Sequence, residues 1–408
     1  MVYDILIIGG GAAGLTSAIA AKRCNPGLSV CILERNERVG KKLLITGNGR
    51  CNITNQDLNI EHYHGDRAFA EYALSWFGLK ETIDFFKSLG VIIKFEGQKA
   101  YPYSLQASSV LDALRFEAQD LGCEIICGCH VEEIVKTGGI FKAKAGGQFS
   151  SRCVIVATGG CSYPRLGSDG SGHRMLQKLG HSVTSLYPAI VQVKTKERIV
   201  KSLKGIKVES RVTAKVNNKI AGTDFGEVLF TEYGLSGPPI LQLSRLVSVN
   251  PPGSVEFFLD FMPDMEFSEI VDTCEYRAKQ HPRRQLSEFF TGMINKRLGQ
   301  EIVKSCGLAL NDEYAVLTSS NIKTMAGLIK SFPFTAVGTT GFANAQVTAG
   351  GVLCDEFLLK TLESKIVKGL FAAGEVLNID GDCGGYNLQW AWSSGYLAGF
   401  SAAVKLSK

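Results

Sequence analysis

The pattern of apolar and polar positions gives the chain a strand and a helix at its start. VYDILII is a continuous apolar run typical of a buried strand, and an Ala-rich segment that reads as a helix follows a glycine turn. A second apolar run, SVCILE, predicts another strand and ends in Glu34. This order of elements predicts an α/β domain at the amino terminus.

The middle of the chain changes its pattern twice. From about 190 to 262, short segments such as VESRVTAKV and SVEFFLDF alternate apolar and polar residues, and Gly, Asn and Pro turns separate them. This pattern predicts a small antiparallel sheet or barrel. Residues 265–332 carry helical spacing in FSEIVDTCEYRAKQ, QLSEFFTGMINKRL and SSNIKTMAGLIKSF, with breaks at His281-Pro282 and around Gly307. The glycine-containing segment VGTTGFANAQVTAGGV then leads back to the first domain.

Length and composition limit the setting. A chain of 408 residues exceeds what one hydrophobic core usually organises, so two or three domains are expected. Its apolar runs fall far short of the ~20 residues that span a bilayer. The twelve cysteines are scattered without any C-x-x-C, which favours reduced thiols over disulfides, a dithiol pair or a metal site. We expect a soluble cytoplasmic protein with no membrane or metal partner.

The first turn carries a dinucleotide fingerprint. Gly9, Gly11 and Gly14 fit G-x-G-x-x-G between the strand and the helix, and Glu34 follows twenty residues after the last glycine. In this motif the first two glycines let the backbone turn and approach a pyrophosphate, the third packs helix on strand, and the acid binds ribose hydroxyls. The alternative is a glycine-rich turn in an ordinary α/β domain.

Three later segments favour a flavin, which distant parts of a chain must wrap. The loop GKKLLITGNGRCNITN offers Lys41, Lys42 and Arg50 to phosphates and TGNGRCN to a flat ring. SRCVIVATGGCSYPRLGSDGSG is a strand that runs into Thr158, Gly159 and Gly160. Near the carboxyl end, a strand, Glu375 and a glycine turn precede a helix whose first amides, at Gly385, Tyr386 and Asn387, would face the electron-rich edge of a flavin.

These motifs resemble the BaiN/RdsA family of NAD(P)/FAD-dependent oxidoreductases, in the glutathione-reductase-like flavoprotein superfamily. The matching segments include GGGAAGL, TGNGRCN, ATGGCSYPRLGSDGSGH, LFTEYGLSGPPILQLSR, QVTAGGV and GLFAAGEVLNIDGDCGGYN, and they extend over nearly the whole chain. The resemblance implies an α/β fold with a discontinuous Rossmann-like FAD-binding domain (1–189 and 346–408). It also implies an inserted antiparallel β-barrel (190–263 and 333–345) that carries a small helical subdomain (264–332).

By the same resemblance, Glu34 holds the adenosine ribose, Val131 the adenine edge, Glu375 the ribityl chain, and Gly385 to Leu388 a flavin carbonyl. The full set of expected cofactor-binding residues is Gly9, Gly11, Ala12, Ala13, Gly14, Glu34, Arg35, Lys41, Lys42, Gly47, Asn48, Gly49, Arg50, Cys51, Asn52, Val131, Thr158, Gly159, Gly160, Gly374, Glu375, Gly385, Tyr386, Asn387 and Leu388.

The resemblance implies that FAD is the cofactor and that NAD(P)H is a transient reductant. No second dinucleotide fingerprint follows residue 150, so the nicotinamide would dock and leave. The implied reaction is reduction of a carbon–carbon double bond conjugated to a carbonyl, in a uridine of ribosomal RNA or in a bile-acid or steroid enone. The alternatives are an oxidase of a small amine or aminoketone, and a flavin-bearing RNA-binding protein without turnover.

Four side chains, Cys51, Cys383, Tyr163 and Glu232, are candidates for the chemistry. Cys51, between Arg50 and Asn52, is the first candidate for the proton donor because neighbouring cations tune a thiol's pKa; a buried, inert thiol is the alternative. Cys383 is the second thiol, with the same alternative. Tyr163 would contact substrate.

Glu232 stands before GLSGP, where many relatives have histidine. It is either an acid of raised pKa or a solvated turn carboxylate. Arg165, just beyond ATGG, is either a further substrate contact or a phosphate or structural contact.

One stretch bears on the substrate. Residues 194–219 contain nine Lys/Arg and two Glu, a balance of +7 against +5 for the whole chain. Such a segment would bind the phosphates of RNA. Its alternative is a solvated lysine-rich face that discourages edge-to-edge aggregation. The sequence leaves the oligomeric state open.

Overall fold

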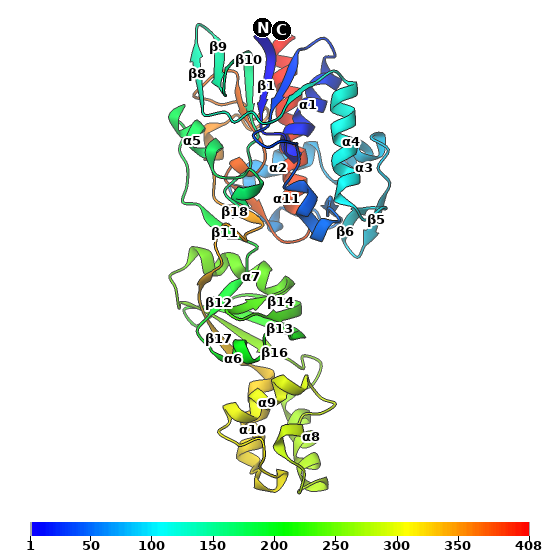
Figure 1. Cartoon of the computed structure of the whole chain (residues 1–408), viewed down its shortest axis with the longest axis vertical. Coiled ribbons are helices and arrows are strands. Elements are labelled where there is room, and N and C mark those ends of the chain that lie inside the picture. The colour runs from blue at the N-terminus through cyan, green and yellow to red at the C-terminus, as the bar shows by residue number, and fades with distance from the viewer. Residues whose placement is uncertain (1, 408) are drawn as a thin grey trace. The chain divides into compact units, whose positions relative to one another are not determined.

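The computed structural model describes residues 2–407. They form two compact units, which are treated separately below. The first runs up to Pro188 and resumes at Phe342, and the second is Ala189–Gly341 (Figure 1). The finer separation of a helical subdomain at 264–332 stays a prediction.

The first unit is a Rossmann-type α/β domain built on a seven-stranded sheet in the order β7-β2-β1-β10-β9-β8, with β19 also paired to β10. The strands β1, β2, β7, β10 and β19 run parallel, and β9 and β8 add an antiparallel edge. Their bounds are β1 Val2–Ile8, β2 Val30–Leu33, β7 Glu124–Ile126, β8 Glu133–Thr137, β9 Ile140–Lys144, β10 Gln148–Val156 and β19 Leu370–Ala372. Parallel strands covered on both faces are apolar throughout, as VCIL of β2 and VIV of β10 are.

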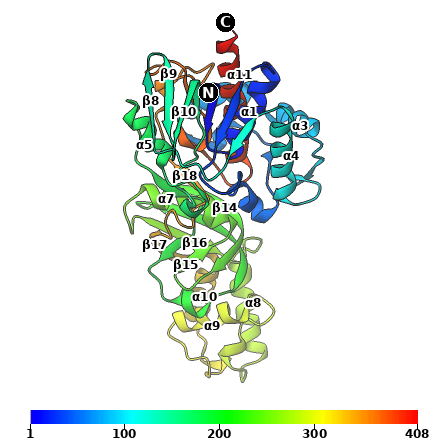
Figure 2. The ribbon, with the colours of Figure 1, turned by 45° about the horizontal axis from the view of Figure 1, so that its top comes forward.

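Two helices pack unusually closely beside this sheet. They are α1 (Ala12–Cys24) and α11 (Tyr386–Leu406), which Figures 1 and 2 show next to β1. A Cβ added at Gly399 would lie 2.1 Å from the carbonyl oxygen of Ser17, so only glycine permits this approach. The Ser17 hydroxyl donates to the carbonyl of Gly395 at 2.8 Å. The contact brings the carboxyl-terminal helix against the first helix.

The remaining elements of the first unit are short. Its other helices are α2 Arg67–Trp76, α3 Leu79–Ser88, α4 Ala107–Asp120 and α5 Ser171–Lys178. Small sheets pair β3 Thr54–Asn55 with β6 Lys99–Pro102 and β5 Ile93–Glu96, β4 Tyr63–Gly65 with β20 Ile379–Gly381, and β11 Tyr187–Ala189 with β18 Val347–Ala349. The β4–β20 pair joins segments more than 300 residues apart and positions part of the site described below.

The second unit contains a closed barrel in the order β12-β15-β14-β13-β16-β17, whose hydrogen-bonded neighbours are all antiparallel. The strands are β12 Val193–Thr195, β13 Lys207–Val216, β14 Lys219–Phe230, β15 Gly234–Ser236, β16 Val255–Asp260 and β17 Phe332–Thr339. Along β16, alternate residues are buried, as the sequence pattern predicts for a strand with one face in a core. β17 follows the helical segment in the chain, and it closes the barrel by pairing with β12 and β16.

The helices of the second unit are α6 Ile199–Ser202, α7 Pro238–Val249, α8 Phe267–Gln280, α9 Lys296–Ser305 and α10 Ser319–Lys330. The helical spacing predicted in QLSEFFTGMINKRL is wrong for most of its length. This segment contains only a 3₁₀ turn at Leu286–Glu288, and α9 begins at Lys296. Asn295 starts α9 because its side chain accepts hydrogen bonds from the amides of Arg297 and Leu298.

All twelve cysteines are free thiols. Within residues 2–407, no cluster of histidine, cysteine and acidic side chains has the arrangement of a metal site. No helix of the described chain has the length and apolar character needed to cross a membrane.

Candidate functional site

The three glycines of the first turn have three different surroundings. Gly9 has a φ of +103°, and an added Cβ would lie 2.5 Å from the carbonyl oxygen of Ala157. At Gly14 an added Cβ would lie 1.9 Å from the carbonyl oxygen of Gly9. At Gly11, which precedes α1, a Cβ would meet nothing within 4 Å. The turn, the open approach and the close packing are those that a pyrophosphate-binding turn requires, with Ala12 and Ala13 in the first turn of the helix.

Glu34 lies at the carboxyl end of β2, and its side chain reaches back to this turn. One carboxylate oxygen accepts the amide of Gly10 at 2.9 Å, and the other accepts the amide of Asn36 at 2.8 Å. The neighbouring Arg35 forms an ion pair with Asp169 at 2.6 Å. Burial opposes ionisation of Asp169, but its hydrogen bonds with Arg35 and Ser171 lower its pKa to about 2.

Lys42 and Glu375 form the charged centre of the site. The Lys42 ammonium lies 2.7 Å from one oxygen of Glu375 and donates to the hydroxyl of Ser162 at 2.6 Å. The other Glu375 oxygen accepts from Ser162 at 2.8 Å and from the amide of Thr348 at 2.8 Å. Burial raises the pKa of Glu375, yet Lys42, Ser162 and Thr348 together outweigh burial and lower it. Lys42 therefore has a protein partner, whereas the Lys41 ammonium has none among the described residues.

Glycines complete this centre. A Cβ at Gly160, just beyond β10, would lie 2.9 Å from a Glu375 oxygen, and one at Gly159 would lie 3.9 Å from the other oxygen. Gly374 has a φ of +76°, and its added Cβ would lie 3.0 Å from the Cβ of Ala13. Thr158 is half-buried beside them. The ends of β10 and β19 and the first turn of α1 therefore converge.

The TGNGRCN loop has an unusual backbone. Gly47, Asn48, Gly49 and Cys51 all have positive φ, and such a run is costly for the two that are not glycine. Arg50 turns away from the loop, because its guanidinium pairs with Glu96 at 3.0 Å and stacks over Tyr101 at 4.4 Å. The expectation that Arg50 meets phosphate has no support in these contacts.

Cys51 differs from the sequence-based expectation. Its side chain is fully buried, and burial raises its pKa to about 12 against the opposing effect of a hydrogen bond with Thr46. Among the described residues no cation contributes to the pKa of this thiol, and Arg50 is engaged with Glu96 and Tyr101. A thiol with so high a pKa releases its proton poorly at neutral pH, which favours the packing role over acid catalysis.

Asn52 and Gly385 face each other at a second part of the site. The Asn52 side-chain oxygen is buried without a hydrogen-bond partner in the described chain. A Cβ at Gly385 would lie 2.9 Å from that oxygen. Gly385 immediately precedes α11, so the free amides at the start of the helix, beginning at Tyr386, lie at this point. An unpartnered polar atom beside a glycine and a helix start fits an edge of a polar ring such as a flavin.

Other expected residues are placed as follows. Asn387 holds the preceding loop, because its side chain exchanges hydrogen bonds with Gly381 at 2.9 and 2.7 Å. Leu388 and Cys383 are half-buried, and Val131 is buried in the core of the first unit. Tyr163 is half-buried with a φ of +54°, and Arg165 is exposed.

Glu232 lies in the second unit and does not have the predicted raised pKa. It is fully exposed and pairs with Lys204 at 2.6 Å. The hydrogen bond and charge of Lys204 lower the pKa of Glu232 below its ordinary value. The solvated turn carboxylate is the correct description of this residue.

Sequence reasoning missed a cluster beside α11. His62 and His64 both contact Asp382, and the ring of His62 stacks on Tyr386. Asp382 belongs to the GDCGGYN motif, but its histidine partners lie 320 and 318 residues away. The only local signal was the HYH spacing. In the structure His62 ends a 3₁₀ turn (Ile60–His62) and His64 lies in β4.

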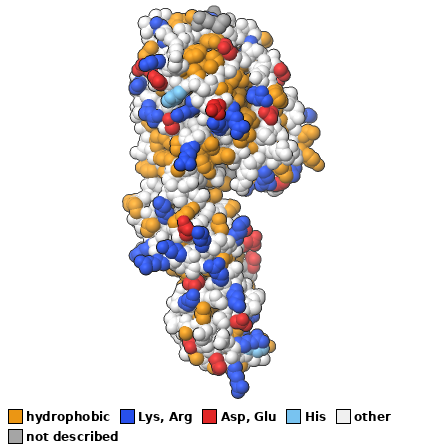
Figure 3. Space-filling model, viewed as in Figure 1, with side chains coloured by type: hydrophobic (Ala, Val, Ile, Leu, Met, Phe, Trp, Pro, Cys, Tyr) orange, Lys and Arg blue, Asp and Glu red, His pale blue; other side chains and the backbone are white. Residues whose placement is uncertain are grey.

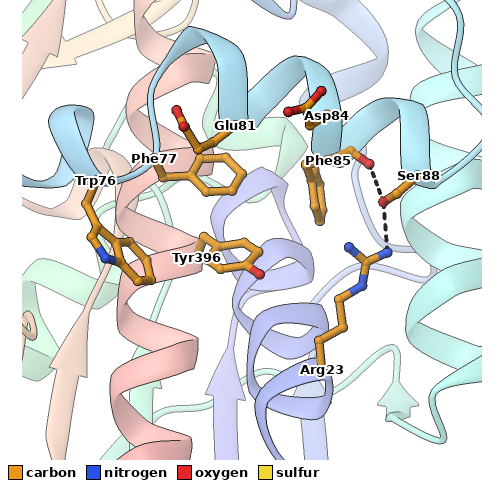
Figure 4. Close-up of a pocket in the computed structure, with 8 residues that line it drawn as sticks. All are labelled: Arg23, Trp76, Phe77, Glu81, Asp84, Phe85, Ser88 and Tyr396. Atoms are coloured by element: carbon orange, nitrogen blue, oxygen red, sulfur yellow. Dashed lines mark hydrogen bonds between the residues drawn. The ribbon is translucent and has the colours of Figure 1, made fainter.

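A pocket of about 370 Å³ lies elsewhere in the first unit, and none of the expected site residues lines it. Figure 4 shows aromatic rings from α2, α3 and α11 packed around it, with Arg23 at one side. Phe77 stacks on Tyr396 at 4.5 Å, and Arg23 is held by Glu117 and Ser88. These contacts are structural.

The doubly wound sheet, the glycine turn before α1 and the converging Glu375 and α11 segments define a Rossmann-type FAD-binding flavoprotein. The chain belongs to the family described as HI0933-like protein Rossmann domain, whose model matches residues 3–401. The family match therefore extends over nearly the whole chain and includes the barrel unit.

Two relatives match over almost their full length. The chain is 39% identical over 403 residues to the 3-dehydro-bile acid delta(4,6)-reductase of Clostridium scindens, with 98% of each chain covered. It is 30% identical over 406 residues to the ribosomal RNA dihydrouridine synthase of Haemophilus influenzae, with 97% of each covered. Among solved structures, an Escherichia coli quinol fumarate reductase FrdA variant matches with a TM-score of 0.52 at 15% identity, covering 100% of this chain and 71% of that one. That likeness concerns the fold alone.

Proposed function

We propose that the protein is an FAD-dependent reductase that uses NAD(P)H to saturate a carbon–carbon double bond conjugated to a carbonyl. The observation that carries this proposal is the glycine turn before α1 together with the Lys42–Glu375 pair and the unpartnered Asn52 oxygen, in a chain with one dinucleotide fingerprint. The names of both full-length relatives describe hydrogen addition to such a bond, in a bile-acid Δ4,6 system and in a uridine. NAD(P)H would dock transiently because no second Rossmann fingerprint is present.

Different residues of the site would bind different parts of the cofactor. The open space at Gly11 and the start of α1 would receive the pyrophosphate, and Glu34 would accept from the adenosine ribose. Lys42 and Glu375 would lie along the ribityl chain, and Asn52 with the first amides of α11 would face a polar edge of the ring. When bound, FAD supplies the hydride-transfer chemistry.

The protein must also deliver one proton to the reduced double bond. Cys51 is unsuited because its thiol is buried and its pKa is raised. Tyr163 and Cys383 are half-buried and remain the proposed donors. Replacement of the true donor, as Tyr163→Phe or Cys383→Ala, should slow flavin reoxidation by substrate at least about tenfold and leave flavin reduction by NAD(P)H unchanged. Stopped-flow absorbance of the two half-reactions separates these effects.

The favoured substrate is a small flat enone of the bile-acid or steroid type, because the bile-acid reductase is the more similar of the two relatives. RNA is the second candidate, and the stretch 194–219 supports it. Eight of its nine basic side chains are exposed, the exception being Lys215, and Figure 3 shows Lys and Arg side chains over the barrel. Lys204 and Lys207 already pair with Glu232 and Glu227, which reduces the charge available to phosphate.

A comparison of acceptors, each supplied separately, tests which substrate the protein reduces. Purified protein is given NADPH or NADH with a Δ4 or Δ4,6 steroid ketone, with ribosomal RNA that lacks dihydrouridine, and with an amine or aminoketone. The proposal predicts acceptor-dependent NAD(P)H consumption with the ketone. Consumption with RNA alone would assign the second substrate. Peroxide production from the amine without NAD(P)H would overturn the reductase in favour of an oxidase.

A further inference from the structure

Four charged or titratable side chains meet beside the start of α11. The His62 Nδ1 atom lies 3.0 Å from Asp382 Oδ2, and its Nε2 atom lies 3.1 Å from Asp57 Oδ2. The His64 Nε2 atom lies 2.8 Å from the second oxygen of Asp382. We call these four side chains the histidine clasp.

The geometry points to a proton on each ring nitrogen of His62. Both nitrogens face carboxylate oxygens within hydrogen-bond distance, and only the imidazolium form donates from both. A neutral ring would leave one nitrogen lone pair against a carboxylate. His64 differs, because one nitrogen alone faces a carboxylate, so a neutral tautomer satisfies that contact. His62 is therefore the member of the clasp whose two contacts favour the imidazolium form.

The clasp holds the segment that leads into α11. Asp382 directly follows β20, and its amide donates to the carbonyl of His62 at 2.9 Å. The ring of His62 stacks on Tyr386, the first residue of α11, with centroids 4.4 Å apart and planes at 23°. The segment between them, residues 383–385, contains Gly385 beside the unpartnered oxygen of Asn52.

We propose that His62 is a positioning residue whose imidazolium, held between Asp57 and Asp382, fixes residues 382–386 for the polar edge of the flavin. This inference rests on the flavin site proposed above. Deprotonation of His62 removes one of the two donated hydrogen bonds, loosens the segment and weakens cofactor binding. FAD affinity therefore falls as the pH rises through the pKa of His62.

The charges around His62 support this direction. Burial lowers the pKa of His62, but hydrogen bonds to Asp382 and Asp57 outweigh burial and raise it. The hydrogen bonds donated by a histidine of raised pKa stabilise the folded segment fully below its ordinary pKa of about 6.5. This stabilisation is lost as the pH rises through the raised pKa. The Tyr386 phenol stays neutral over this range because burial raises its pKa. Beside the clasp, Glu61 is paired with Arg67 at 2.9 Å.

Solvent protons reach the clasp, since the side chains of His62 and His64 are 30% and 35% exposed. The test measures the FAD dissociation constant of the full-length protein between about pH 6 and pH 9. Wild type should bind FAD about tenfold more weakly at the alkaline end of this range. This change corresponds to a one-unit difference in the His62 pKa between the FAD-free and the FAD-bound protein. His62→Gln should bind weakly at every pH.

Two further variants make the test specific. Asp57→Asn should keep tight binding at alkaline pH, because the new amide donates to the bare nitrogen of neutral His62. His64→Gln is the matched control and should keep the wild-type pH dependence, since glutamine supplies the single donor needed there. A His62→Gln profile identical to that of wild type would overturn the inference.

A measurement on the unmutated protein guards against variants that fail to fold. Histidine-selective ¹⁵N NMR of the FAD-loaded protein, which has six histidines, should show His62 with both nitrogens protonated at neutral pH. A neutral His62 ring would overturn the inference and leave the reductase proposal standing. Absence of any FAD binding at all pH values would instead overturn the flavin site and the inference together.

Discussion

Replacing Gly11 with alanine separates cofactor binding from folding. Gly11 has a φ of −84°, which alanine adopts freely, and an added Cβ meets nothing within 4 Å. The free energy of unfolding of the apoprotein should therefore change by less than about 1 kcal/mol. If the pyrophosphate lies against this backbone, the new methyl occupies its place. FAD affinity should then fall about 10- to 100-fold, which corresponds to roughly 1.4–2.7 kcal/mol.

Gly14→Ala is the contrasting variant. Its Cβ would lie 1.9 Å from the carbonyl oxygen of Gly9, so the backbone of the turn must move. We expect a loss of about 1–3 kcal/mol or more in unfolding free energy, with FAD lost as a consequence of the distorted turn.

The assay combines urea denaturation of each apoprotein with calorimetric FAD titration. A folded Gly11→Ala protein with the wild-type dissociation constant would refute the reasoning, because the space before α1 could not then hold the pyrophosphate.

Three other predictions follow from the site. Lys42→Met should lower the unfolding free energy of the apoprotein by about 2 kcal/mol, because the half-buried carboxylate of Glu375 loses its cation and keeps only the hydrogen bonds from Ser162 and Thr348. Lys41→Met should change the unfolding free energy by less than about 0.5 kcal/mol in the same urea denaturation. Asp169→Asn should be about 2 kcal/mol less stable to unfolding than wild type above pH ~4. Because the folded-state pKa of Asp169 is about 2, this difference should shrink as the pH falls through that value. An equal difference in unfolding free energy at high and at low pH would contradict this pKa. Iodoacetamide should modify exposed Cys127 well before buried Cys51, as read by peptide mass spectrometry, and rapid labelling of Cys51 would show an accessible thiolate.

The amino-terminal turn was predictable because its information is local. The spacing of Gly9, Gly11 and Gly14 and the acid at Glu34 encode a backbone geometry within about one βαβ unit. The structure reproduces the three glycine environments that the motif requires. The alternating segments after residue 190 likewise predicted a barrel or sheet, and closure by β17 decides for the barrel.

The partners of the charged side chains were not predictable. Lys42 was assigned to phosphate, but it pairs with Glu375, 333 residues away, and Arg50 pairs with Glu96. Burial raised the pKa of Cys51, whereas a thiol that donates a proton near neutral pH needs a lowered pKa. An exposed ion pair lowered the pKa of Glu232, whereas a carboxylic acid in that role needs a raised pKa. Such effects depend on long-range packing, which the local spacing of residues does not specify.

The most direct test of the central claim is an anaerobic titration followed by visible absorbance. NADPH or NADH is added to the flavin-loaded protein, and a stoichiometric amount of steroid enone or ribosomal RNA follows. The account predicts that the nicotinamide bleaches the flavin and that one acceptor restores its absorbance in a 1:1 ratio. A flavin that neither nicotinamide reduces, or a reduced flavin that no conjugated acceptor reoxidises, would contradict it.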